Sequence, residues 1–149
     1  MKNIFLKQRL ATALFIGSLF YGGHTTAHSV GNTIDATGTN ASATDLYQIT
    51  CSSGTDYLIF QIEDRSAPVP GLLMSVQAYF DQRKIMTNTS DSVSGDGKAG
   101  SGAQLWGGDG NYYLSASKTA VGTRQYNITV HCMSKTDHTP EDVGILQQQ

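Results

Sequence analysis

Two cysteines stand at the ends of two runs in which apolar and polar residues alternate. The two apolar rows are Tyr47, Ile49 and Cys51, and Tyr126, Ile128, Val130 and Cys132. Alternation with a period of two is typical of a strand with one buried face, so both cysteines should point into a core. Two inward cysteines require their strands to be neighbours or to face each other across that core. A β-sandwich provides both arrangements.

The same alternation recurs between the two cysteines. It predicts further strands over residues 57–63, 72–80, 85–87, 104–106 and 112–117. Ser53 and Gly54 form a turn signal that predicts a hairpin between the first two strands, whereas the glycine-rich residues 91–102 predict a mobile surface loop. The expected fold is therefore all-β: an antiparallel, jelly-roll-like β-sandwich of about seven to nine strands.

The N-terminal residues have the pattern of an export signal. Positive residues are followed by the apolar residues 10–21 and then by small residues, which predicts cleavage after Ala27. The apolar run is too short for a membrane span, and no later stretch reaches the ~20 apolar residues that a spanning helix needs. We expect a signal peptide at 1–27, a flexible lead-in at 28–44 with room for one short strand near residues 32–35, one β-sandwich domain at 45–134 and a disordered tail at 135–149. The mature protein should be secreted or periplasmic.

Cys51 and Cys132 are the only cysteines, and both lie in the predicted exported part. An even count in an oxidising compartment predicts one disulfide between them. Removal of residues 1–27 takes away three of the 10 basic residues and none of the 12 acids, so seven stand against twelve and the mature net charge is about −5. Such a surface has no general attraction for nucleic acid.

Three short motifs resemble the bacterial pre-peptidase C-terminal domain. They are Asp45-Leu46-Tyr47-Gln48-Ile49, Gly110-Asn111-Tyr112-Tyr113-Leu114-Ser115-Ala116 and Gln125-Tyr126-Asn127-Ile128-Thr129-Val130. The resemblance implies a small β-sandwich that binds or assists and does not catalyse. The two cysteines of this sequence are not a hallmark of that family. The whole chain also resembles a group of small exported bacterial proteins that begin His-Ser after the signal.

The sequence leaves open two possible metal sites, one for copper and one for calcium. Cleavage after Ala27 would leave His28 as the mature N-terminus, where amine and imidazole nitrogens suit Cu(II), and His131 or the tail residue His138 could supply a second imidazole. Calcium could be held in the glycine-rich loops, although Asp and Asn are also the residues that tight turns require. The candidate calcium ligands are Asp91, Asp96, Asp109 and Asn111.

Trp106, Tyr112 and Tyr113 lie close together in the sequence and are a candidate binding surface for a protein or a carbohydrate. Alternation allows only one of the two tyrosines to face the core, and packing of Trp106 inside is the alternative. No nucleophile elbow, zinc-protease motif or phosphate-binding loop is present in the sequence, so no enzyme is expected. The sequence thus favours an exported, non-enzymatic binding or accessory module. Its alternatives are a periplasmic copper-binding protein that uses His28 and an extracellular structural or assembly subunit.

Overall fold

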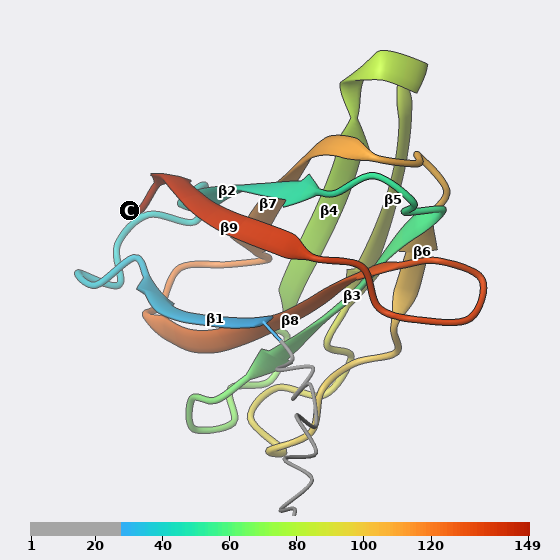
Figure 1. Cartoon of the computed structure of the whole chain (residues 1–149). Helices are drawn as coiled ribbons and strands as arrows, with labels where there is room; N and C mark the ends of the chain where they lie inside the picture. Colours follow the sequence, from blue (N-terminus) through green and yellow to red (C-terminus); the bar gives the residue numbers. More distant parts are fainter. Residues whose placement is uncertain (1–27) are drawn as a thin grey trace, which may run out of the picture.

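The computed structural model describes residues 28–149, which form two antiparallel sheets packed face to face (Figure 1). The predicted signal peptide and its cleavage site after Ala27 lie outside the described residues. The elements are β1 (His28–Ile34), β2 (Thr44–Cys51), β3 (Tyr57–Asp64), β4 (Met74–Phe80), the short 3-10 helix η1 (Asp81–Arg83), β5 (Ile85–Ser90), β6 (Ala103–Leu105), β7 (Gly110–Lys118), β8 (Arg124–Met133) and β9 (Glu141–Gln147). No helix within residues 28–149 is long and apolar enough to cross a membrane.

The strand order defines a jelly roll. One sheet has the order β1-β8-β3-β6 and the other has the order β5-β4-β7-β2-β9. The first eight strands thus form two facing groups of four, as in double-sheet jelly rolls, and β9 is added beside β2. The prediction of an all-β, jelly-roll-like sandwich is confirmed.

The core lies between the sheets and is made by the residues that alternation placed inside. All five even-numbered residues from Leu72 to Phe80 are buried, as are the rows that end in the two cysteines. Cys51 on β2 and Cys132 on β8 form a disulfide with a Cα–Cα distance of 5.6 Å. Because β2 and β8 belong to different sheets, this bond joins the two layers of the sandwich covalently.

The predicted hairpin between the first two strong strands is wrong. β2 and β3 lie in opposite sheets, so the turn at Ser53 and Gly54 carries the chain across the core. A turn signal predicts that the chain reverses, but pairing within one sheet and crossing to the other sheet both satisfy it. In the described chain, β4 and β5 are successive strands that do pair directly.

The segment 28–44, expected to be a flexible lead-in, contains the seven-residue strand β1. β1 pairs with β8 along its whole length, from His28 opposite Val130 to Ile34 opposite Arg124. Only Ile34 is fully buried, since β1 lies at the edge of its sheet and covers little of the core. An edge strand of this kind is held mainly by its backbone ladder, which apolar alternation does not reveal.

The expectation of a disordered tail at 135–149 is also wrong. β9 pairs with β2 over residues 141–147, and the following Gln149 donates its backbone N–H to the carboxylate of Asp45 at 2.7 Å. Ile145 and Leu146 are exposed, and Val143 packs only partly against the core. β9 therefore depends on hydrogen bonds with β2 more than on burial of its own side chains.

Buried polar groups fix the ends of the sandwich. Asp45 is fully buried and accepts hydrogen bonds from the Tyr126 hydroxyl at 2.6 Å and from the Asn32 amide at 2.7 Å. Asp35 and Lys118 form a buried ion pair at 2.8 Å, and the Lys118 ammonium holds the pKa of Asp35 well below its usual range. These hydrogen bonds and this ion pair connect β1, β2, β7 and β8 at one end of the sandwich, and they satisfy polar groups that would otherwise be buried without partners.

The loop expected at 91–102 is present between β5 and β6, but its first half is packed. Asp91 is buried and accepts hydrogen bonds from the backbone N–H groups of Asp64 at 2.8 Å and Val93 at 3.1 Å. A Cβ atom at Gly95 would lie 2.2 Å from the carbonyl oxygen of Ser66, so the backbone approaches that segment closely. The loop is attached by polar contacts, which apolar composition does not predict.

Candidate functional site

The exposed Trp106 ring packs against the half-buried Tyr57 ring, and we call this pair the aromatic platform. Trp106 directly follows β6, Tyr57 begins β3, and their ring centroids are 4.3 Å apart at an interplanar angle of 31°. Trp106 is 52% exposed, so the possibility that it packs inside is wrong. Exposure of a tryptophan costs more hydration free energy than exposure of a smaller apolar side chain, which makes this pair a candidate contact surface.

A packed glycine explains why Trp106 is left outside. A Cβ atom at Gly107 would lie 2.6 Å from the Tyr112 hydroxyl and 2.7 Å from the ring of Phe80, so the backbone rests directly on these two rings. The Tyr112 hydroxyl then donates to the Gly108 carbonyl at 2.6 Å, and Gly108 donates its N–H to the Asp56 carbonyl at 3.1 Å. The backbone of this turn is therefore held on two sides, directly after Trp106.

The two tyrosines of β7 separate as alternation requires. Tyr112 is buried, and burial raises the pKa of its hydroxyl, whereas Tyr113 is exposed on the outer face of the five-stranded sheet. Tyr113 lies opposite Gln48 of β2 and Tyr79 of β4. Trp106 is therefore a surface residue, as one of the two sequence interpretations had it. The two tyrosines grouped with it lie elsewhere, Tyr112 in the core and Tyr113 on the outer face of the five-stranded sheet. The actual partner of Trp106, Tyr57, lies 49 positions earlier and had no local signal.

The three histidines of the described residues meet at one place, together with Glu141. The Nδ1 atom of His28 lies 3.1 Å from Oε1 of Glu141, and Nδ1 of His131 lies 3.7 Å from the same oxygen. The rings of His131 and His138 are in edge contact, with centroids 4.4 Å apart. We call these four residues the histidine cluster. It brings together the two predicted copper ligands and the tail histidine, while Glu141 was missed because it lies in the segment expected to be disordered.

Glu141 is held beside β8 by a hydrogen bond, in which its Oε2 atom accepts the Cys132 backbone N–H at 2.8 Å. Cys132 lies two residues beyond Val130, the partner of His28 in the β1–β8 ladder. The Glu141 side chain is 4% exposed, and a buried carboxylate needs such donors. The cluster thus lies where the edges of the two sheets, β1 with β8 and β9 with β2, come together.

His131 is the most enclosed of the three imidazoles. Burial lowers the pKa of His131, the nearby His138 and His28 lower it further, and the Glu141 carboxylate opposes them. Its Nδ1 atom is buried and has no hydrogen-bond partner. The imidazole of His131 is therefore favoured in its neutral form, which can act as a ligand through nitrogen. As the side chains stand, no group of three or more His, Cys, Asp or Glu in residues 28–149 is arranged to hold a metal ion.

The four candidate calcium ligands are not brought together. Asp91 and Asp96 lie in the loop between β5 and β6, where Asp96 accepts the Lys98 backbone N–H at 2.9 Å. Asn111 accepts the Thr50 hydroxyl at 3.0 Å, and Asp109 is exposed in the turn before β7. Asp91 donates its backbone N–H to the carbonyl of Met74, the first residue of β4, whereas the turn that contains Asp109 packs on Phe80, the last residue of β4. Asp91 and Asp109 therefore lie at opposite ends of that strand. Their oxygens serve turns and strand ends, in agreement with the alternative that the sequence left open.

The strand order and the bond between the sheets define the described part of the chain as a small disulfide-linked jelly-roll β-sandwich. No family model matches the chain, and no curated protein matches it. The resemblance to the pre-peptidase C-terminal domain stays a prediction from three short motifs.

Proposed function

We propose that the protein is an exported, non-enzymatic binding module that recognises carbohydrate through the aromatic platform. The observation that carries the proposal is the 52% exposure of Trp106, whose ring packs against Tyr57 on a disulfide-linked scaffold. Flat aromatic rings offer a large contact area with little loss of conformational entropy on binding. A disulfide between the sheets supports export, because such bonds persist in oxidising compartments.

Polar groups beside the platform suit a hydroxylated ligand. The Arg83 guanidinium lies next to Gly108, and the exposed Asp109 follows in the same turn. Carbohydrate recognition combines ring stacking with hydrogen bonds from such side chains. Jelly-roll sandwiches also include lectin domains, which supports the proposal by analogy of fold alone.

The proposed lack of catalysis is supported by the adjacent carboxylates Asp64 and Glu63, which are a possible acid pair in the sequence. Asp64 is fully buried, pairs with Arg124 at 3.6 Å and accepts the Ser94 hydroxyl at 3.0 Å. The adjacent Glu63 lies on the other face of β3 and pairs with Arg65 at 3.1 Å. These two carboxylates cannot act together on one substrate, since they point to opposite sides of the strand.

The test uses Trp106 as its own reporter, because it is the only tryptophan of the chain. The purified exported protein is titrated with soluble fragments of cellulose, chitin and peptidoglycan while tryptophan fluorescence is recorded. We expect one of these ligands to shift the emission of the wild type. Affinities of the wild type and of Trp106→Ala, which has no tryptophan left to report, are compared by calorimetry. Trp106→Ala should weaken binding about tenfold, the size expected for loss of one aromatic stacking contact.

The matched control is Val121→Ala, which shortens another exposed apolar side chain, 57% exposed, away from the platform. This variant should bind as the wild type does. Failure of all three saccharides to bind, or binding that leaves tryptophan emission and the Trp106→Ala affinity unchanged, contradicts the proposal.

A further inference from the structure

We propose that the histidine cluster is a binding site for a divalent transition-metal ion, with Cu(II) bound in preference to Zn(II). This site is separate from the aromatic platform and does not depend on the proposed carbohydrate binding. It begins from a convergence: His28, His131 and His138 come from three different segments, and they are all the histidines within residues 28–149. His28 and His131 each approach the Glu141 carboxylate, and the ring of His138 contacts the ring of His131.

The donor set decides the class of ion. Three imidazoles and one carboxylate offer nitrogen and oxygen ligands that suit Cu(II) and Zn(II), and such a site disfavours Ca(II), which requires six or more oxygens. Among divalent ions of the first transition row, Cu(II) forms the most stable complexes with nitrogen ligands. Cu(II) is therefore the ion expected to bind most tightly to the histidine cluster.

Glu141 marks the point around which ligands can gather. Its Oε1 atom lies 3.1 Å from Nδ1 of His28 and 3.7 Å from Nδ1 of His131. As the side chains stand no three of them surround one point, so coordination needs rotation of the imidazole rings. The buried Nδ1 of His131 has no hydrogen-bond partner to give up, which removes one cost of that rotation.

The backbone beneath the cluster is ordered on every side. His28 is paired with Val130 in the β1–β8 ladder, and His131 lies on β8 directly before the disulfide-bonded Cys132. His138 forms a bridge with Met133, and the next residue, Thr139, donates its N–H to the Cys132 carbonyl at 2.9 Å. His138 is thus fixed within reach of His131, contrary to the expectation that it lies in a disordered tail.

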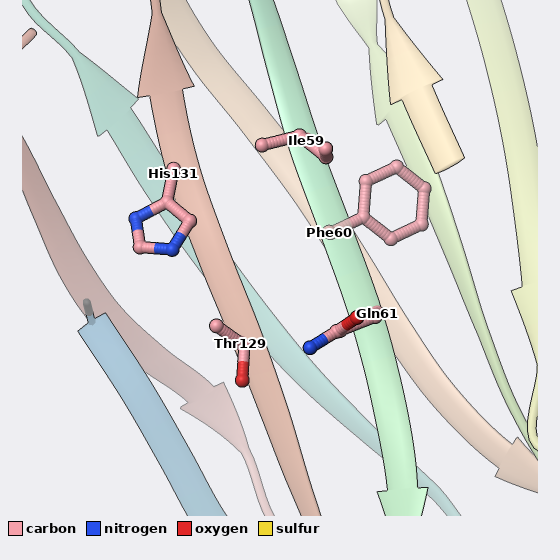
Figure 2. A pocket seen from close by; sticks show the side chains of 5 residues that line it. All are labelled: Ile59, Phe60, Gln61, Thr129 and His131. Atoms are coloured by element: carbon pink, nitrogen blue, oxygen red, sulfur yellow. The ribbon is translucent and has the colours of Figure 1, made fainter. Parts of the chain in front are cut away.

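The outer face beside His131 leaves room for a further ligand on the ion. A hollow of about 110 Å³ lies between β3 and β8, lined by Ile59, Phe60, Gln61, Thr129 and His131. Figure 2 shows the His131 imidazole at one end of this hollow, with Thr129 and Gln61 along it. This volume suits a few waters or one small anion beside the ion, since each water occupies about 30 Å³.

The experiment measures metal binding by the mature exported protein directly. The mature N-terminus is first confirmed by mass spectrometry, and the protein is then titrated calorimetrically with Cu(II), Zn(II) and Ca(II). We expect one equivalent of Cu(II) to bind with sub-micromolar affinity, Zn(II) to bind more weakly and Ca(II) not to bind. The Cu(II) complex should show nitrogen hyperfine structure from imidazole by electron paramagnetic resonance.

Variants then assign the ligands. His138→Ala changes an exposed side chain and should not disturb folding, and it should weaken Cu(II) binding at least about tenfold, the effect seen even for partners outside the coordination shell. His131→Ala should do the same. The matched control for Glu141→Gln is Asp142→Asn, since Asp142 is the adjacent carboxylate but is exposed and outside the cluster. Glu141→Gln should weaken binding, and Asp142→Asn should leave it unchanged.

An N-terminally extended form of the protein distinguishes Cu(II) binding by the histidine cluster from chelation by the chain terminus alone. An alanine added before His28 moves the terminal amine, and binding should survive because three imidazoles remain. Binding that disappears in this extended protein but is unchanged in His131→Ala and His138→Ala would overturn the proposal. Cu(II) affinity no better than that of free histidine would also overturn it.

Discussion

The Cys51–Cys132 disulfide is the covalent link between the two sheets, and its removal tests how the sandwich is stabilised. The bond joins residues separated by 81 positions in the sequence. In the chain-entropy model, a loop of that length restricts the unfolded chain enough to contribute about 4.5 kcal/mol at 25 °C. Domains of this size are stable by only about 5–15 kcal/mol in total, so the loss is a large fraction of the whole.

The perturbation is the double variant Cys51→Ala/Cys132→Ala, compared with the oxidised wild type in urea. Unfolding is followed by far-ultraviolet circular dichroism and by Trp106 fluorescence. We expect the free energy of unfolding to fall by about 4 kcal/mol and the melting temperature to fall by on the order of 15 °C. The urea m-value should rise, because the unfolded variant exposes more surface than a cross-linked chain.

The control uses a reductant. Tris(2-carboxyethyl)phosphine should destabilise the wild type by a similar amount and should leave the double variant unchanged. A loss below about 1 kcal/mol with an unchanged m-value would refute the reasoning, since the unfolded chain would then be equally restricted without the bond.

Three further predictions test polar contacts in the fold. Tyr126→Phe removes the hydroxyl that donates to the buried Asp45, which should cost about 2–3 kcal/mol of unfolding free energy in urea, and a change below about 0.5 kcal/mol would contradict the role of this bond. Because Lys118 holds the folded pKa of Asp35 below its usual 3.8, the pair should stabilise the protein fully above that pH and progressively less below it. Melting temperatures from pH 7 to pH 2 should therefore fall less for Asp35→Asn, relative to its own neutral value, than for the wild type. Limited trypsin digestion should cut first after the exposed Lys98, in the half of its loop that lacks the Asp91 anchor, and cleavage within a strand first would show that the loop is packed throughout.

The strands that could be predicted from sequence are those that bury a face. In β2, β3, β4, β7 and β8 every second side chain must be apolar to fill the space between the sheets, so the pattern is written in the sequence. β9 could not be found in this way, and of β1 only a short strand near residues 32–35 could be suggested. Both strands lie at sheet edges and are held by backbone hydrogen bonds, which any side chain permits.

The candidate sites divide along the same line. His28, His131 and Trp106 could be singled out because imidazole and indole carry chemistry wherever they lie. Their partners could not, since Tyr57 and Glu141 are ordinary residues until the fold brings them to Trp106 and His28. Contact between residues far apart in sequence depends on strand order, which local pattern does not encode.

The sequence by itself therefore determined the all-β class, the inward phase of both cysteines and the disulfide between them. These features follow from a period of two and from the count of two cysteines, both of which are local or compositional properties. Only the tertiary structure decided that the chain crosses the core after β2, so that β2 and β3 lie in different sheets. It also decided that the C-terminal segment adds a strand beside β2, and that this strand brings Glu141 to the histidines. Those outcomes depend on which strands share a sheet, and the free energy that selects them arises from contacts between distant segments.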